Sequence, residues 1–390
     1  MNEAIKSGLD RLQSSALGAG AIFLILSAIG WYMNPARFLR SYLVAFWFWL
    51  ALTLGCLTIL MIHYMVTGRW GYLARRPLEA GSRVMPLMAI LFIPIVISVP
   101  TIYSWANPEL VASLNLTHFK LEYLNARFWV IRAILYFAIW FLWIFLLNRW
   151  SLQEDADGSS RRYFDRMRRL SGPGLVLFAF TVTYAAVDWV MSLEPGFFST
   201  IYGMIFMVVP ALLGVALVVL TLTAFSNYEP FATLAEPKRF NDYGNLLLVF
   251  IMLWAYLQFD QFLIIWAGNL QDEIPWYVVR ARGTWGGVAV ALFLFHFAVP
   301  FLLVLQRAVT RRNRVLSTVC VLLLIMEAVD LYWMISPAFS PKGPQLSWLD
   351  PVTFLGIGGV WVAWFAWQLK SRPLLPLHDP RFEGVLTVGS

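Results

Sequence analysis

The 390-residue chain is 60% hydrophobic and only 13% charged, and its formal net charge is +7. Soluble domains average about 45–50% apolar and about 25% charged residues, so this composition excludes an ordinary soluble protein and indicates a polytopic membrane protein. The basic residues fall in short segments between apolar runs, which is typical of topology signals and needs no nucleic-acid partner.

Ten apolar runs in the chain are long enough to cross a bilayer core, which takes about 20 residues. They predict an all-α integral membrane protein of ten transmembrane helices, because a spanning segment must satisfy its own backbone hydrogen bonds in lipid. The predicted spans lie near 16–33, 39–66, 81–104, 126–148, 173–192, 199–224, 243–268, 284–306, 315–336 and 351–369.

The spans divide the chain into five parts: an N-terminal segment, four spans, a connector, six spans and a tail. Their predicted bounds are 1–15, 16–148, 149–172, 173–369 and 370–390. The connector is rich in arginine and predicts a short basic amphipathic helix on the membrane surface. The first span lacks a small-residue cleavage site, so we interpret it as a retained anchor.

The distribution of Lys and Arg predicts the orientation of the chain. The two termini and the loops after even-numbered spans hold 21 of these residues, whereas the loops on the opposite side hold 7. Because cytoplasmic loops carry the excess of Lys and Arg, both termini are expected in the cytoplasm.

Several polar side chains lie at membrane depth, where a charge costs about 2.5–3.5 kcal/mol on insertion scales and often marks a proton relay or a substrate site. Our candidates for a proton path are Asp188, Glu194, Gln258, Asp260, Gln261, His296, Glu327 and Asp330. Purely structural roles stay open: Asp188 and Glu194 can lie at the water interface, and Asp260 can be neutral and hydrogen-bonded to a neighbouring helix.

The pair in span nine is the hardest to explain by packing alone. Glu327 and Asp330 are three residues apart, so they share one helix face. Two acids on one buried face favour sharing protons rather than ionising together.

The sequence predicts no redox centre in this chain. His63 and His296 differ in predicted depth by roughly 10 Å at ~1.5 Å per residue, which does not suit a bis-histidine haem. Cys56 and Cys320 cannot supply the four thiolates that an iron–sulfur cluster normally takes. We expect no metal and no catalytic residue of its own. His63 fits a packing role or a donor to a quinone carbonyl.

Two long motifs resemble a known family. The segments DWVMSLEPGFFSTIYG at 188–203 and YLQFDQFLIIWAGNLQDEIPWY at 256–277 resemble the NrfD-like (polysulfide reductase, PsrC-like) membrane subunits of alternative complex III, a bacterial quinol:electron acceptor oxidoreductase. Length, span number and motif order look most like its ActF branch, also called quinone-binding subunit 2.

The resemblance implies an integral subunit of the bacterial inner membrane that holds no prosthetic group. Its implied partners are membrane lipids, a homologous NrfD-like subunit, and periplasmic iron–sulfur and cytochrome c subunits. Quinone or menaquinone is the implied small molecule, and buried polar residues are the implied proton path.

Our hypothesis is that the polar residues of span seven meet Glu327, Asp330 and His296 in one track that opens outward near Asp188 and Glu194. The track would conduct protons coupled to quinol oxidation. Two alternatives stay open at this point: a stand-alone proton-coupled transporter, and a structural scaffold of a respiratory complex.

Overall fold

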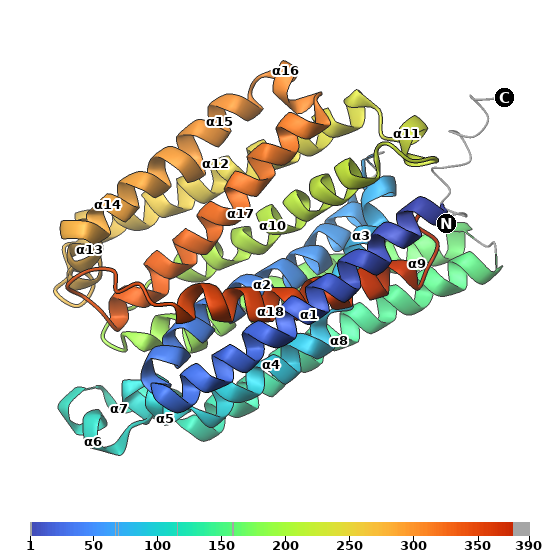
Figure 1. Ribbon diagram of the computed structural model, residues 1–390. Helices are drawn as coiled ribbons and strands as arrows, with labels where there is room; N and C mark the ends of the chain where they lie inside the picture. The colour runs from blue at the N-terminus through green and yellow to red at the C-terminus, as the bar shows by residue number, and fades with distance from the viewer. Residues whose placement is uncertain (1, 67, 69, 115, 158–159, 377–390) are drawn as a thin grey trace.

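The computed structural model describes residues 2–66, 68, 70–114, 116–157 and 160–376 (Figure 1). Every regular element among these residues is a helix, and ten helical stretches are long and apolar enough to cross a membrane. The prediction of an all-α protein with ten candidate spans is therefore confirmed.

Eight of these stretches are each built on one long helix. These helices are α1 (Glu3–Met33), α2 (Pro35–Met65), α8 (Ala126–Asp157), α9 (Ser160–Trp189), α10 (Tyr202–Phe225), α12 (Pro237–Gly268), α17 (Asn313–Ile335) and α18 (Leu349–Lys370). Two of the eight stretches, those of α9 and α17, continue into a 3-10 turn. The remaining two of the ten combine consecutive helices. One joins α3 (Gly71–Ser82) to α4 (Met85–Ile97), and one joins α14 (Gly283–Leu292), the π-helical turn η4 (Phe293–Ala298) and α15 (Val299–Val304).

The remaining elements are short and connect the long helices. They are α5 (Val99–Ile102), η1 (Ser104–Ala106), α6 (Pro108–Val111), η2 (Ala112–Leu114), α7 (His118–Tyr123), η3 (Met191–Leu193), α11 (Phe231–Leu234), α13 (Ile274–Ala281), α16 (Arg307–Thr310) and η5 (Ser336–Ala338).

Helix α2 is the centre of the bundle and is buried along almost its whole length. It packs against α3, α9, α10 and α18, and α10 in turn packs against α12 and α17. In Figure 1 the helices α12, α14, α15 and α17 form one side of the molecule, while α1, α4, α8 and α9 form the other. The candidate site lies in the first of these groups.

Glycines let α2 and α10 come into direct backbone contact. A Cβ atom at Gly55 would stand 1.9 Å from the Pro210 carbonyl oxygen, and one at Gly214 would stand 2.6 Å from the Gly55 oxygen. Small residues at such crossings allow the close packing that holds helices together in lipid. The tight crossing joins the two halves of the bundle.

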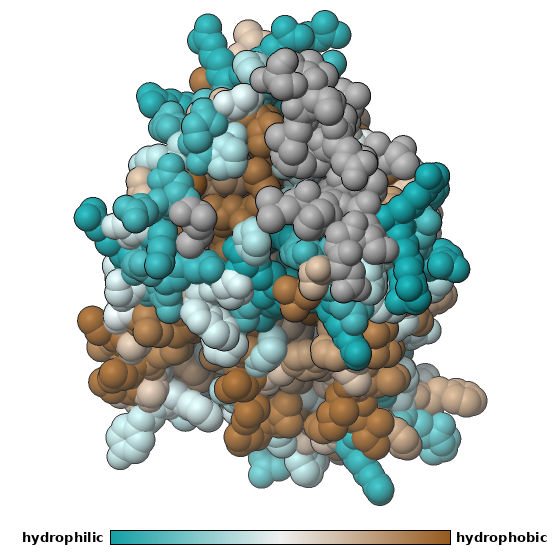
Figure 2. Space-filling model, turned by 90° about the vertical axis from the view of Figure 1, so that its right-hand side faces the viewer, coloured by the Kyte–Doolittle hydropathy of each residue, from teal (hydrophilic) through white to brown (hydrophobic). Residues whose placement is uncertain are grey.

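Both ends of the described chain lie at the same end of the bundle. Lys370, the last residue of α18, pairs with Asp10 of α1, and α1 and α18 pack side by side. Figure 2 looks at this end: hydrophilic side chains gather in the upper part of the view and hydrophobic ones cover much of the lower part.

The structure differs from three predicted segment boundaries. The predicted third span, near 81–104, begins earlier, because α3 starts at Gly71 and is buried throughout. Residues 3–15 already belong to α1. Residues 149–157 of the predicted connector belong to α8 and residues 160–172 belong to α9, so the described part of the connector forms no separate short helix. Residues 377–390 of the predicted tail lie outside the described residues.

Candidate functional site

Three titratable side chains meet in the bundle half formed by α12, α14, α15 and α17. Glu327 and Asp330 lie in α17, and His296 approaches from η4. One polar atom from each of the three side chains lies within 4.8 Å of the others, and none of these residues is more than 1% exposed. We call this group the His–Glu–Asp cluster.

The π-helical turn η4 places His296 in the cluster. Pro300 follows four residues later and has no N–H with which to bond the His296 carbonyl. The Val299 N–H bonds to the Leu294 carbonyl, five residues back, so the helix widens here. Such turns occur frequently at functional sites. The imidazole ring of His296 lies 4.2 Å from the ring of Trp254 in α12.

Hydrogen bonds hold Asp330 but leave its two neighbours incompletely paired. The Trp254 Nε1–H donates to Asp330 Oδ2 at 3.0 Å, and Gln258 Nε2 lies 3.5 Å from Oδ1. Nε2 of His296 lies 3.3 Å from Oε2 of Glu327, which makes an ion pair only when the imidazole is protonated. Apart from this contact, the polar atoms of His296 and Glu327 have no hydrogen-bond partner among the described residues.

This arrangement is suited to holding a proton. Burying an ionised carboxylate that has no partner costs free energy. A proton shared among the three side chains neutralises one carboxylate and so lowers that cost. One imidazole and two carboxylates are also ligand types that divalent metal ions accept. A hydrated cation would have to lose its water in apolar surroundings, whereas a proton passes between carboxyl and imidazole groups, so the surroundings favour a proton.

A cavity of about 590 Å³ lies beside the cluster, between α12, α13, α14, η4 and α17. Eight of its fourteen lining residues are aromatic, and Asp330 and Gln258 also line it. Tyr256, Phe259 and Phe293 line the cavity and are all more than half exposed. The cavity therefore extends from Asp330 to the apolar outer surface of the bundle.

Glu194 is paired at the end of the bundle near α13. The Arg280 Nη2 donates to the Glu194 carboxylate at 2.7 Å and to the Met334 carbonyl at 2.9 Å. The guanidinium also lies over the Trp276 ring, 3.8 Å from its centroid. Because Met334 lies one turn beyond Asp330 in α17, this pair lies one helical turn from the cluster, toward the C-terminal end of α17.

Asp188 belongs to a different group of side chains. Its carboxylate accepts two hydrogen bonds from Arg132, at 2.8 and 2.9 Å, and one from the Tyr136 hydroxyl at 2.7 Å. Arg132 and Tyr136 lie in α8, and Asp188 is fully buried. This geometry is that of a bidentate ion pair between neighbouring helices. The predicted track does not connect Asp188 to the cluster.

The polar residues of the motif at 256–277 lie on different faces of α12 and have different neighbours. Gln258 reaches Asp330, and Gln261 is buried beside Ser199, whose hydroxyl lies 3.3 Å from its Oε1. Asp260 is half-buried and has no hydrogen bond or ion pair with a described residue. Two residues advance an α-helix by about 200°, so Asp260 cannot share the face of Gln258. The structure therefore does not bring Asp260 together with Gln258 and the His–Glu–Asp cluster.

His63 lies apart from the cavity. It is fully buried near the end of α2, where its ring packs against the rings of Tyr64 and Trp70. A Cβ at Gly71 would stand 1.4 Å from His63 Nδ1, so this histidine fills the space that a glycine leaves. It does not line the cavity beside Asp330.

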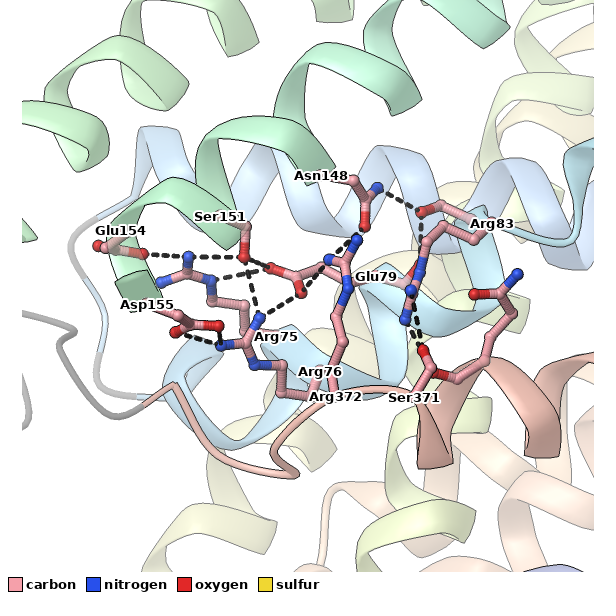
Figure 3. Close-up of polar contacts among 12 residues, drawn as sticks. Arg75, Arg76, Glu79, Arg83, Asn148, Ser151, Glu154, Asp155, Ser371 and Arg372 are labelled. Atoms are coloured by element: carbon pink, nitrogen blue, oxygen red, sulfur yellow. Dashed lines mark hydrogen bonds and ion pairs between the residues drawn. The ribbon is translucent and has the colours of Figure 1, made fainter. Parts of the chain in front are cut away.

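A second polar group, drawn in Figure 3, lies where α3, α8 and the segment after α18 meet. We call it the arginine–acid network. Its members are Arg75, Arg76, Glu79, Arg83, Asn148, Ser151, Glu154, Asp155, Ser371 and Arg372.

Glu79 is the central acceptor of the arginine–acid network. It accepts from Arg76 at 2.7 Å, from Arg75 at 3.0 Å, from the Ser151 hydroxyl at 2.6 Å and from Arg372 at 3.4 Å. Burial lowers the pKa of the Arg372 guanidinium below its ordinary value, and the Glu79 carboxylate opposes this effect.

Glu154 and Asp155 take up the remaining charge of the network. Glu154 pairs with Arg75, and both oxygens of Asp155 accept from Arg76. The charges of six residues of the network therefore balance inside the bundle. The three acids are Glu79, Glu154 and Asp155, and the three arginines are Arg75, Arg76 and Arg372.

Sequence reasoning missed the basic partners of the acids. Arg75 and Arg76 fall between the predicted spans 39–66 and 81–104, because their charges lower the local hydropathy, although they lie in the buried helix α3. Arg280 was counted as a residue of an outer loop. Arg132 lies well inside the predicted span 126–148, and a cation at that depth could have indicated a buried acid partner such as Asp188.

Neither a scan against protein-family models nor a search of curated proteins finds a match to this chain.

Proposed function

We propose that this chain is an integral membrane subunit of a quinol-oxidising respiratory complex of the alternative complex III type, in which the His–Glu–Asp cluster receives and passes on protons. The proton role rests on one observation, the meeting of three buried titratable groups from α17 and η4. The type of complex rests on the resemblance of the motifs at 188–203 and 256–277 to NrfD-like, and most of all ActF-like, subunits.

The surroundings of the cluster support a short proton path rather than the long predicted one. Gln258 lies against Asp330 on one side, and the Arg280–Glu194 pair lies one turn further along the bundle. A path from the cluster outward would pass this pair, and the Asp188 pair in α8 and α9 would take no part in it.

The proposed partners are a homologous NrfD-like subunit and periplasmic iron–sulfur and cytochrome c subunits, which would accept the electrons. Solubilising the native membrane in mild detergent and isolating the tagged chain tests this assembly. We expect the tagged chain to co-isolate with a c-type cytochrome absorbance and with non-haem iron. Isolation as a monomer that still exchanges protons would instead favour a stand-alone transporter.

We also propose that the membrane is the bacterial inner membrane and that both termini face the cytoplasm. The contact between Lys370 and Asp10 supports the same side of the membrane for both ends of the described chain, and the excess of basic residues favours the cytoplasm for that side. A fluorescent reporter that folds only in the cytoplasm, fused after Ser390, should be fluorescent. Activity of a periplasm-specific enzyme fused at the same position would refute the orientation.

A further inference from the structure

A groove of about 480 Å³ lies on α9 where this helix passes the end of α2, away from the His–Glu–Asp cluster. We call it the α9 groove. The start of α9 lies at the end of the bundle that also holds both ends of the described chain (Figure 1). Its lining residues are Met65, the last residue of α2, and Asp165, Arg168, Arg169 and Gly172 of α9.

The charged groups of the α9 groove are not paired within the described part of the protein. Arg168 and Arg169 are exposed, and neither makes an ion pair with a described residue. The Arg169 Nε donates to the backbone carbonyl of Asp165 at 3.3 Å rather than to its carboxylate. The groove therefore presents two guanidinium groups and one carboxylate to a ligand.

These groups follow one another in a definite order along α9. Asp165 lies one turn before the two arginines, about 6 Å further from the apolar part of the helix. Val176 and Phe180 follow Arg169 at seven and eleven residues, a spacing that keeps one helix face, and they are 56% and 58% exposed. Along this face a carboxylate is followed by two guanidinium groups and then by an apolar surface.

The space between the charges and the apolar surface is kept open by a glycine. A Cβ atom at Gly172 would meet only the Met65 side chain, at 3.8 Å, so a larger residue would project into the groove. A topology signal requires only that basic residues are numerous on this side. It does not require an open groove, an acid beside the arginines or an apolar face in line with them.

We propose that the α9 groove binds one molecule of phosphatidylethanolamine. Its phosphate lies at Arg168 and Arg169, because guanidinium groups match phosphate oxygens in charge and geometry. Its ammonium group, joined to the phosphate by a short ethanolamine link, donates hydrogen bonds to the Asp165 carboxylate. Its acyl chains cover Val176 and Phe180.

This order of charges selects among phospholipids. The quaternary ammonium of phosphatidylcholine has no N–H to donate to Asp165, and phosphatidylglycerol carries no cation for it. Every membrane-spanning chain contacts bulk lipid, whereas this groove selects one head group. The selection does not depend on the type of complex to which the chain belongs.

Native mass spectrometry of the full chain in a neutral detergent tests the proposal. The probes are dioleoyl phosphatidylethanolamine, dioleoyl phosphatidylcholine and dioleoyl phosphatidylglycerol, and the Kd of the first bound lipid is measured for each. We expect phosphatidylethanolamine to bind about threefold to fivefold more tightly than either of the others, as for one additional charge-assisted contact at a surface.

Two variants separate the roles of the charges. Arg168→Gln combined with Arg169→Gln should weaken binding of phosphatidylethanolamine about twentyfold, because each arginine near a phosphate contributes roughly fivefold. Asp165→Asn should remove the preference for phosphatidylethanolamine and leave binding of phosphatidylglycerol undiminished. All three residues are exposed, so these variants should fold, which thermal unfolding checks.

Two further variants control for position and for space. Arg161→Gln combined with Arg162→Gln removes the same charge from exposed residues of α9 that do not line the groove, and it should leave each Kd unchanged. Gly172→Leu keeps every charge but fills the groove, so it should weaken binding of all three lipids.

Three results would overturn the proposal. The first is an equal Kd for phosphatidylethanolamine and phosphatidylcholine in the original chain. The second is an equal loss of binding in the Arg161, Arg162 control, which would assign the effect to overall charge. The third is displacement of the lipid by soluble phosphoethanolamine at equal concentration, which would show that the acyl chains contribute nothing. None of these bears on co-isolation with cytochrome and iron–sulfur subunits, which tests the proposed function separately.

Discussion

Replacing Glu79 by glutamine is expected to destabilise the folded chain by about 3–5 kcal/mol, the usual cost of removing one partner from a buried ion pair. The amide removes the negative charge that faces Arg75, Arg76 and Arg372. The balanced group of three acids and three arginines within the arginine–acid network then carries one excess positive charge where water cannot solvate it. Unfolding in mixed micelles, followed by tryptophan fluorescence, measures the change.

Two further variants separate charge balance from packing. Glu79→Gln combined with Arg372→Gln restores equal numbers of acids and arginines within the balanced group, so part of the lost stability should return. Glu122→Gln removes an exposed carboxylate that lies 3.2 Å from His118, and it should change stability by less than about 0.5 kcal/mol. A Glu79→Gln variant as stable as the original chain would show that the network contributes no net free energy.

Replacing both Glu327 and Asp330 by their amides is expected to leave the assembled complex intact and to slow proton-coupled quinol oxidation about a hundredfold, the range of a lost proton-transfer group. The amides keep the size of the side chains and much of their hydrogen bonding with Trp254 and Gln258. Only the capacity to take up a proton disappears. Quinol oxidation and proton release are measured together in liposomes that contain the whole complex.

Asp260→Asn is the matched control for this prediction. Asp260 lies in the same motif as Gln258 but has no hydrogen bond or ion pair with a described residue, so its amide should leave both rates unchanged. Either single amide should have a smaller effect than the double variant, because the remaining acid still takes up a proton. Wild-type rates in the double variant would show that the cluster does not carry protons.

Much of the architecture follows from hydropathy, which depends on composition over about 20 residues and needs no knowledge of neighbours. The ten spans were predicted in this way and are confirmed. The juxtaposition of Glu327 and Asp330 on one face of α17 also follows from the sequence, because their spacing matches one helical turn. These features are local, so the sequence alone determines them.

What only the tertiary structure decided is which buried charges meet. Asp188 pairs with Arg132 across 56 positions and Glu194 pairs with Arg280 across 86, and no local pattern specifies such partners. The same holds for α3, whose arginines look like loop residues until α8 supplies Glu154 and Asp155. A charge is tolerated in a membrane bundle only beside its partner, and helix packing determines where that partner lies.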